Sequence, residues 1–164
     1  MLKIGVNKIK KILIIIFLLS FNIIYSFSFF SSKPKFTEEQ ETILKLVNQE
    51  RQKKGVAPLK LNKTLNETTL KKSDDMAVNK YFSHNSKKLG TPFDLMKKNG
   101  VKYRIAGENI AMGQKNPQEV MKSWMNSKGH RENILNSKFT EMGISRDSYN
   151  KNIWTQHFIG NNKK

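Results

Sequence analysis

Apolar residues recur at helical spacing through the first half of the chain. The segment "TEEQETILKLVNQERQKKG" has Thr37 at its start and Gln40 three residues later, which is the capping-box pattern of a helix N-terminus. Its inward positions follow the helical period and are Ile43, Leu44, Leu46 and Val47, with weaker matches at Glu50 and Arg51. Because Gly55 is a stop signal, we predict a helix between Thr37 and Gly55.

Three further helices begin at a capping Asn or Thr. They are 62–80, which begins at Asn62; 91–100, which begins at Thr91 and Pro92; and 116–127, which begins at Asn116 and Pro117. The residues predicted to face inward are Leu65, Thr69, Leu70, Ser73, Met76 and Ala77 in the first of these, and Val120, Met121 and Trp124 in the last.

The last third of the chain changes to short β-branched and aromatic runs. "FTEMGISRD" and "NIWTQHFIG" flank the turn-forming "DSYNKN", which is typical of a β-hairpin. Helices followed by strands predict an α+β domain in which helices pack on an antiparallel sheet.

The first 33 residues form a separate unit. Lysines precede an uncharged apolar run over 12–30, the arrangement of an export signal, although the run is nearly long enough to span a membrane. We therefore predict a signal peptide or signal anchor at 1–33 and one domain at 34–164 outside the cytoplasm, secreted or held at the cell envelope; cleavage is left open. The chain has no cysteine, which excludes disulfides and lipidation through cysteine.

The net charge of +17 does not by itself identify a class of partner. Such a charge can favour nucleic acid or anionic lipid. Here the lysines are scattered in pairs without interleaved aromatic residues, so a solvated surface is the simpler interpretation. Export also argues against a nucleic-acid partner.

Candidate chemistry is confined to three histidines and one acid: His84, His130, His157 and Glu108. His84 and Glu108 lie in loop-like stretches after helices, where functional side chains concentrate. No local metal motif joins the four residues, so only the fold could bring them together. Each could equally be a packed or capping side chain.

Five ordered segments carry a family resemblance. "YFSHNS", "AGENIA", "SWMNSKGHRENIL", "FTEMGIS" and "IWTQHF" together resemble the CAP superfamily (cysteine-rich secretory, antigen 5 and pathogenesis-related proteins), in its bacterial SCP-domain branch. The resemblance covers about residues 36–160. It implies a three-layer α-β-α sandwich with a central antiparallel sheet, in agreement with the helix-then-strand pattern.

The resemblance also implies a cleft with two histidines and two acids. Matched by motif, His84, Glu108 and His130 are three of the four. The second acid is missing, since the region where it is expected reads Trp124-Met125-Asn126-Ser127. His157 matches no position of the tetrad and is interpreted as a strand residue; the further cleft candidates are Asn109, Ser127 and His157.

Three functions follow as hypotheses. The first is an extracytoplasmic binding module for a host protein, a lipid or a sterol, which the family resemblance favours. The second is a divalent-metal site, for Zn²⁺ or a similar ion, on His84, Glu108 and His130. The third is a metal-assisted hydrolase or protease, which the missing acid disfavours because acid–base catalysis needs both partners.

Overall fold

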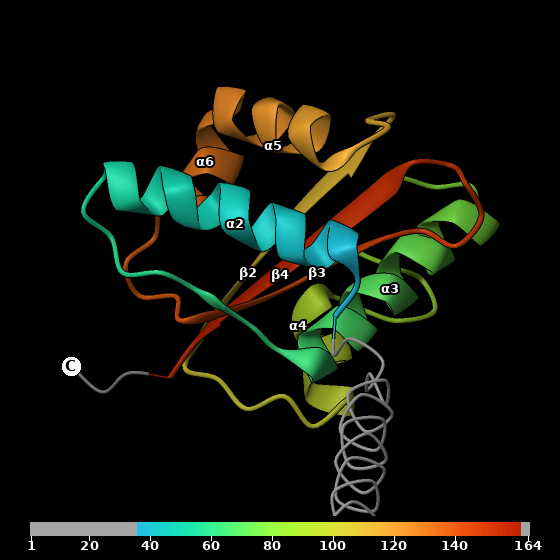
Figure 1. Cartoon of the computed structure of the whole chain (residues 1–164). Coiled ribbons are helices and arrows are strands. Elements are labelled where there is room, and N and C mark those ends of the chain that lie inside the picture. Colours follow the sequence, from blue (N-terminus) through green and yellow to red (C-terminus); the bar gives the residue numbers. More distant parts are fainter. Residues whose placement is uncertain (1–35, 162–164) are drawn as a thin grey trace, which may run out of the picture. The chain divides into compact units, whose positions relative to one another are not determined.

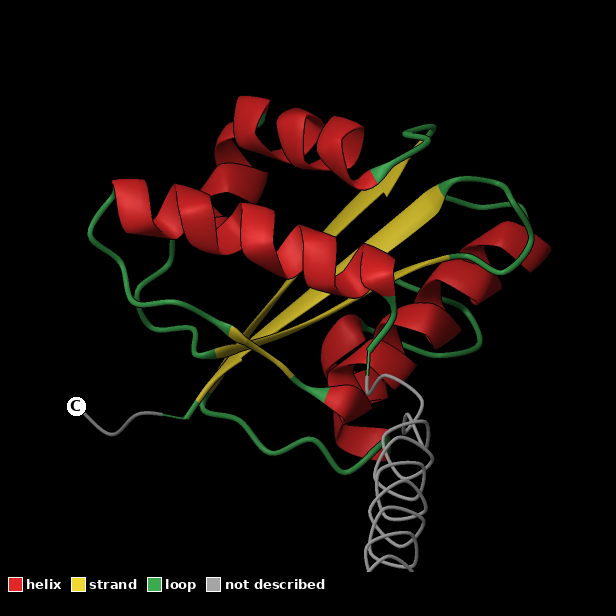
Figure 2. Ribbon diagram, in the orientation of Figure 1, coloured by secondary structure: helices red, strands yellow, loops and turns green. Residues whose placement is uncertain are grey.

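The computed structural model describes residues 36–161, which form three layers around a four-stranded sheet (Figures 1 and 2). The predicted export segment at 1–33 lies outside the described residues. The helices are α2 (Glu38–Lys53), α3 (Lys63–Val78), α4 (Pro92–Lys98), α5 (Pro117–Asn126) and α6 (Lys128–Ile134). The strands are β1 (Lys60–Leu61), β2 (Ile105–Met112), β3 (Glu141–Arg146) and β4 (Ile153–Gly160). The predicted α+β sandwich is confirmed.

The sheet has the strand order β1-β3-β4-β2. The predicted hairpin is β3 and β4, and β2 pairs antiparallel to β4 on the far side. β1 is only two residues long and runs parallel to β3, so the prediction of an antiparallel sheet holds for the three longer strands. Among residues 36–161, no helix combines the length and the apolar character needed to cross a membrane.

The placement of Glu108 in an irregular loop was wrong. Residues 105–112 form strand β2, in which Glu108 pairs with His157 of β4. The polar "GEN" inside the strand interrupts the alternation that normally indicates a strand. The segment forms a strand because it pairs with β4 along its whole length, which the local residue pattern does not indicate.

Helix boundaries follow the predicted caps. Thr37 and Gln40 form both hydrogen bonds of the capping box, and Thr91 does the same with Asp94. Asn62 accepts a hydrogen bond from the backbone of Leu65 at the start of α3. That helix ends at Val78 rather than at residue 80, because Lys80 has a left-handed backbone with φ 54°.

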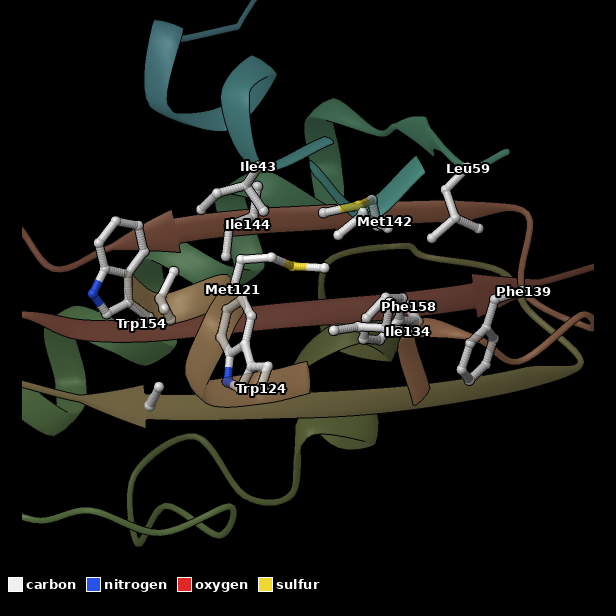
Figure 3. Packing of buried hydrophobic residues seen from close by; sticks show 13 residues of the cluster. Ile43, Leu59, Met121, Trp124, Ile134, Phe139, Met142, Ile144, Trp154 and Phe158 are labelled. Carbon is white, nitrogen blue, oxygen red and sulfur yellow. The ribbon is translucent and has the colours of Figure 1, made fainter. Parts of the chain in front are cut away.

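One face of the sheet carries the hydrophobic core. Helices α2, α5 and α6 cover this face, and the largest buried side chains there are Trp124 and Trp154 (Figure 3). The 13 buried members are Ile43, Val47, Leu59, Ala111, Val120, Met121, Trp124, Ile134, Phe139, Met142, Ile144, Trp154 and Phe158. The inward positions predicted for the last helix, Val120, Met121 and Trp124, are confirmed.

Helix α3 covers the opposite face with polar groups along its middle and apolar side chains near its two ends. The hydroxyls of Thr69 and Ser145 lie 2.9 Å apart, and those of Ser73 and Thr155 lie 2.8 Å apart. Leu70, predicted inward, is 39% exposed, whereas Lys72 is 1% exposed. Buried polar groups are stable when they are hydrogen-bonded, so the middle of the seam between α3 and the sheet is a polar network, with one small apolar cluster around Leu65 and another around Met76.

Candidate functional site

Glu108 and His157 lie side by side in the polar seam. They are direct partners on β2 and β4, and His157 Nε2 donates to Glu108 Oε2 at 2.9 Å. The other ring nitrogen, Nδ1, lies 2.8 Å from the hydroxyl of Thr68 on α3. His157 is fully buried, so its ring is held by Glu108 on one side and by the helix on the other.

His84 occupies the second oxygen of the same carboxylate. Its Nδ1 donates to Glu108 Oε1 at 2.6 Å, while 55% of its side chain stays exposed. The loop that carries His84 is fixed by Ser86, whose hydroxyl donates to the buried Asp75 at 2.6 Å. Both oxygens of Glu108 are therefore engaged by imidazoles. We call His84, Glu108 and His157 the Glu108 cluster.

Charge keeps the Glu108 carboxyl ionised. Burial alone would raise its pKa, but the hydrogen bonds from His157 and His84 and the nearby charge of Lys72 hold the pKa below its ordinary value. In return, the hydrogen bond to Glu108 raises the pKa of His84, against the lowering effects of partial burial and of Lys72. Glu108 and His84 thus each favour the charged form of the other.

A second group of polar residues adjoins the cluster, and sequence reasoning missed it. Lys72 Nζ donates to the hydroxyl of Tyr81 at 3.2 Å and lies 5.0 Å from the centre of that ring. Tyr81 in turn donates to Asp75 at 2.5 Å, and burial together with this bond raises the pKa of Tyr81 to about 12. Asp75 and Tyr81 line a pocket of about 500 Å³ that also includes Ser83 and Asn85, the neighbours of His84.

His130 reaches the site from the other layer. It lies in α6, a separate short helix that follows α5 after a break at Ser127. Asn109 on β2 donates to the His130 carbonyl at 3.2 Å and accepts from Asn133 at 2.8 Å, which ties α6 to the strand. The side chain of Asn109 thus binds the backbone of α6 at His130, and its amide nitrogen also donates to Gln156.

The ring of His130 is half-buried and has no hydrogen-bond partner within residues 36–161. Burial lowers its pKa, and the charge of His84 lowers it further. The two imidazoles are therefore within electrostatic reach of each other. Ser127 only precedes α6, and its side chain makes no capping bond.

The predicted metal ligands His84, Glu108 and His130 stay a prediction. In the part of the chain that is described, no three acidic or histidine side chains are grouped so that they could hold a metal ion. Glu108 is poorly placed as a third ligand, because its side chain is only 2% exposed and each of its oxygens already accepts from a histidine. What remains is a pair of imidazoles, His84 and His130.

The pKa order of the two exposed histidines is a first prediction. We expect His84 to titrate at higher pH than His130 in an NMR titration, and Glu108→Gln to lower the pKa of His84, since a neutral amide does not favour the imidazolium. Because the folded pKa of His84 is raised, the stability from this pair is complete below the unfolded pKa of about 6.5 and is lost as the pH rises through the folded value. Glu67→Gln, which removes an exposed carboxylate, is the control. An unchanged His84 pKa in Glu108→Gln would contradict the assigned pair.

The three-layer fold with an acid and histidines at one edge of its sheet defines a domain of the CAP type. The family model of the cysteine-rich secretory protein family matches residues 44–158, and the chain belongs to this family. It is 50% identical over 121 residues to the Bacillus subtilis protein YkwD, a match that covers 74% of this chain and 47% of that protein. It is 38% identical over 123 residues to the membrane protein YlbC of the same organism, covering 75% of this chain and 35% of that one.

A solved structure shows the same fold at a similar identity. The crystal structure of an extracellular protein containing an SCP domain, from Bacillus anthracis, superposes with a TM-score of 0.70 at 35% identity, and the match covers 74% of this chain and 40% of that chain. The present chain thus matches less than half the length of each of these three relatives.

Proposed function

We propose that the protein is an exported binding module of the CAP family and not a hydrolase. The observation that carries this proposal is the engagement of both Glu108 oxygens by histidines. A general base must lie within reach of substrate, whereas the Glu108 side chain is only 2% exposed and each of its oxygens already accepts from a histidine. Residues 124–127 contain no second acid to replace it.

Export is supported from two directions. The first 33 residues have the basic and apolar regions of an export segment. The relative from Bacillus anthracis is described as extracellular. The ligand classes proposed for the module are a host protein, a lipid or a sterol.

Divalent-metal binding is a second candidate, favoured by the orientation of His84. When the ring is neutral its one proton, on Nδ1, is donated to Glu108 and the Nε2 lone pair is free, and a carboxylate behind a histidine is the usual support of a metal ligand. The lowered pKa of His130 keeps that ring neutral and able to coordinate near pH 7. A bound Zn²⁺ would supply a Lewis-acidic centre for an oxygen of the ligand. With two protein ligands, binding should be weak.

Zinc calorimetry on the full chain tests the imidazole pair. We expect a weak binding isotherm for the wild type and at least a tenfold weaker one, about 1.4 kcal/mol, for the variant His84→Ala/His130→Ala. Lys87→Ala, an exposed change in the same loop as His84, is the matched control. Isotherms that do not differ between the double variant and the wild type would remove the metal site.

The choice between binding and hydrolysis is tested separately. A broad peptide library should remain uncleaved with and without zinc; cleavage that disappears in Glu108→Gln would overturn the binding module. Pull-down and lipid-overlay assays with the full chain then ask where ligands bind. Binding that survives both His84→Ala and Glu108→Ala would place the interaction away from the Glu108 cluster.

A further inference from the structure

An apolar pocket of about 550 Å³ opens where the end of α3, the end of β2 and the start of β4 meet. Its floor includes the buried side chains of Met76 and Ile153. Phe82 and Met112 stand at its wall with 44% and 53% of their surface exposed. Apolar side chains of this size rarely gather at a surface without a partner.

Two lysines flank this pocket. Lys80 and Lys151 line it, no acidic residue does, and neither ammonium has an ion-pair partner among the described residues. Both lysines lie in tight turns. The backbone of Lys80 has a left-handed conformation, and so do those of Asn150 and Asn152 on either side of Lys151. We call Phe82, Met112, Lys80 and Lys151 the lysine-flanked patch.

We propose that the lysine-flanked patch docks on the surface of an anionic phospholipid membrane. Phe82 and Met112 would enter the acyl boundary while Lys80 and Lys151 contact phosphates, which is how basic and apolar residues share an interface. The net charge of +17 adds long-range attraction to the same surface.

The chemistry of the lining favours lipid over a peptide. Apart from the two ammonium groups, the only polar side chain in it is Tyr81, whose hydroxyl already donates to Asp75. A peptide buried there would leave backbone amides unpaired, which is costly, whereas an acyl chain needs no such partner. The inference rests on the proposed function for export alone and does not involve the Glu108 cluster.

Tryptophan reporters in the full chain test the docking. Trp124 and Trp154 are fully buried, so a tryptophan placed by Phe82→Trp reports on the patch. Phe93→Trp is the matched control, because Phe93 is 43% exposed on α4 and does not line the pocket. Both reporters carry the same N-terminal segment, so any affinity of that segment for vesicles affects both equally and does not change the difference between them.

The vesicles contain brominated phosphatidylcholine, alone or mixed with phosphatidylglycerol. We expect stronger quenching of the Phe82→Trp reporter than of the Phe93→Trp reporter on the anionic vesicles. Adding Lys80→Glu and Lys151→Glu should reduce this excess at least about tenfold. Equal quenching of the two reporters, or an excess that is the same without phosphatidylglycerol, would overturn the proposal.

Self-association through the same face is the competing outcome. A dimer in sedimentation velocity that dissociates in Met112→Lys would replace the lipid by a second copy of the chain. Zinc calorimetry on the lysine variants should match the wild type, since neither lysine contacts the Glu108 cluster. A failure of the docking proposal is thereby distinguished from a failure of the metal site.

Discussion

Gly143→Ala should destabilise the domain by about 3 kcal/mol, the upper end of the usual cost of overpacking, or more. Gly143 lies on β3 where α3 crosses the sheet. A Cβ built on it would lie 2.7 Å from the backbone nitrogen of Asn66 and closer still to the carbonyl carbon of Leu65. These are backbone atoms of a helix, which cannot rotate away as a side-chain end can.

Urea denaturation of the full chain measures this effect. Gly129→Ala is the control, because a Cβ there meets nothing within 4 Å and alanine is the better helix former inside α6. We expect the control to be neutral or slightly stabilising. A Gly143→Ala protein with wild-type stability would show that α3 is not held as close to the sheet as the structure indicates.

The same glycine explains why the site lies where it does. Gly143, His157 and Glu108 form one row across β3, β4 and β2, facing α3. Because Gly143 has no side chain, the helix settles onto the sheet and brings Thr68 to His157. The acid and its buried histidine are thus a consequence of strand register and helix approach.

The sequence predicted the elements well where local chemistry determines them. Thr37, Asn62, Thr91 and Asn116 each cap a helix in the structure. On α3, five of the six positions predicted to face inward are buried: Leu65, Thr69, Ser73, Met76 and Ala77. The prediction was wrong for Leu70, which is exposed, and it missed the buried Lys72, because part of this helix face packs through polar groups. Only the hydrogen bonds from neighbouring strands make such a face stable, and these are long-range.

The candidate site was predictable only in part, because some of its contacts depend on long-range strand pairing. His84 and Glu108, linked through the family resemblance, do form a hydrogen bond. The partnership of His157 with Glu108 depends on the register of β2 against β4, and β2 was not recognised as a strand. Lys72 and Thr68 carry no local signal, since a lysine or a threonine in a helix is ordinarily exposed.

Arg51 is the one buried cation that the helical period did indicate, though weakly. It is fully buried, and its guanidinium donates to four backbone carbonyls, those of Ala57, Ile134, Asn136 and Phe139, at 2.7 to 3.1 Å. Ile134 is the last residue of α6, and Asn136 and Phe139 belong to the segment that joins α6 to β3. Arg51 therefore holds in place the helix that carries His130.

Arg51→Met should cost about 3 kcal/mol or more, because it leaves buried carbonyls without donors. Arg51→Lys should recover only part of the loss, since an ammonium cannot reproduce the planar fork of the guanidinium. Arg131→Met, which removes a single bond to the Met125 carbonyl, is the control and should cost far less. Urea denaturation gives the stability, and the NMR signals of the His130 ring report on α6. If Arg51→Met unfolds like the control and leaves His130 unchanged, the segment after α6 must be held by its own backbone contacts, and Arg51 would have no part in positioning the second imidazole.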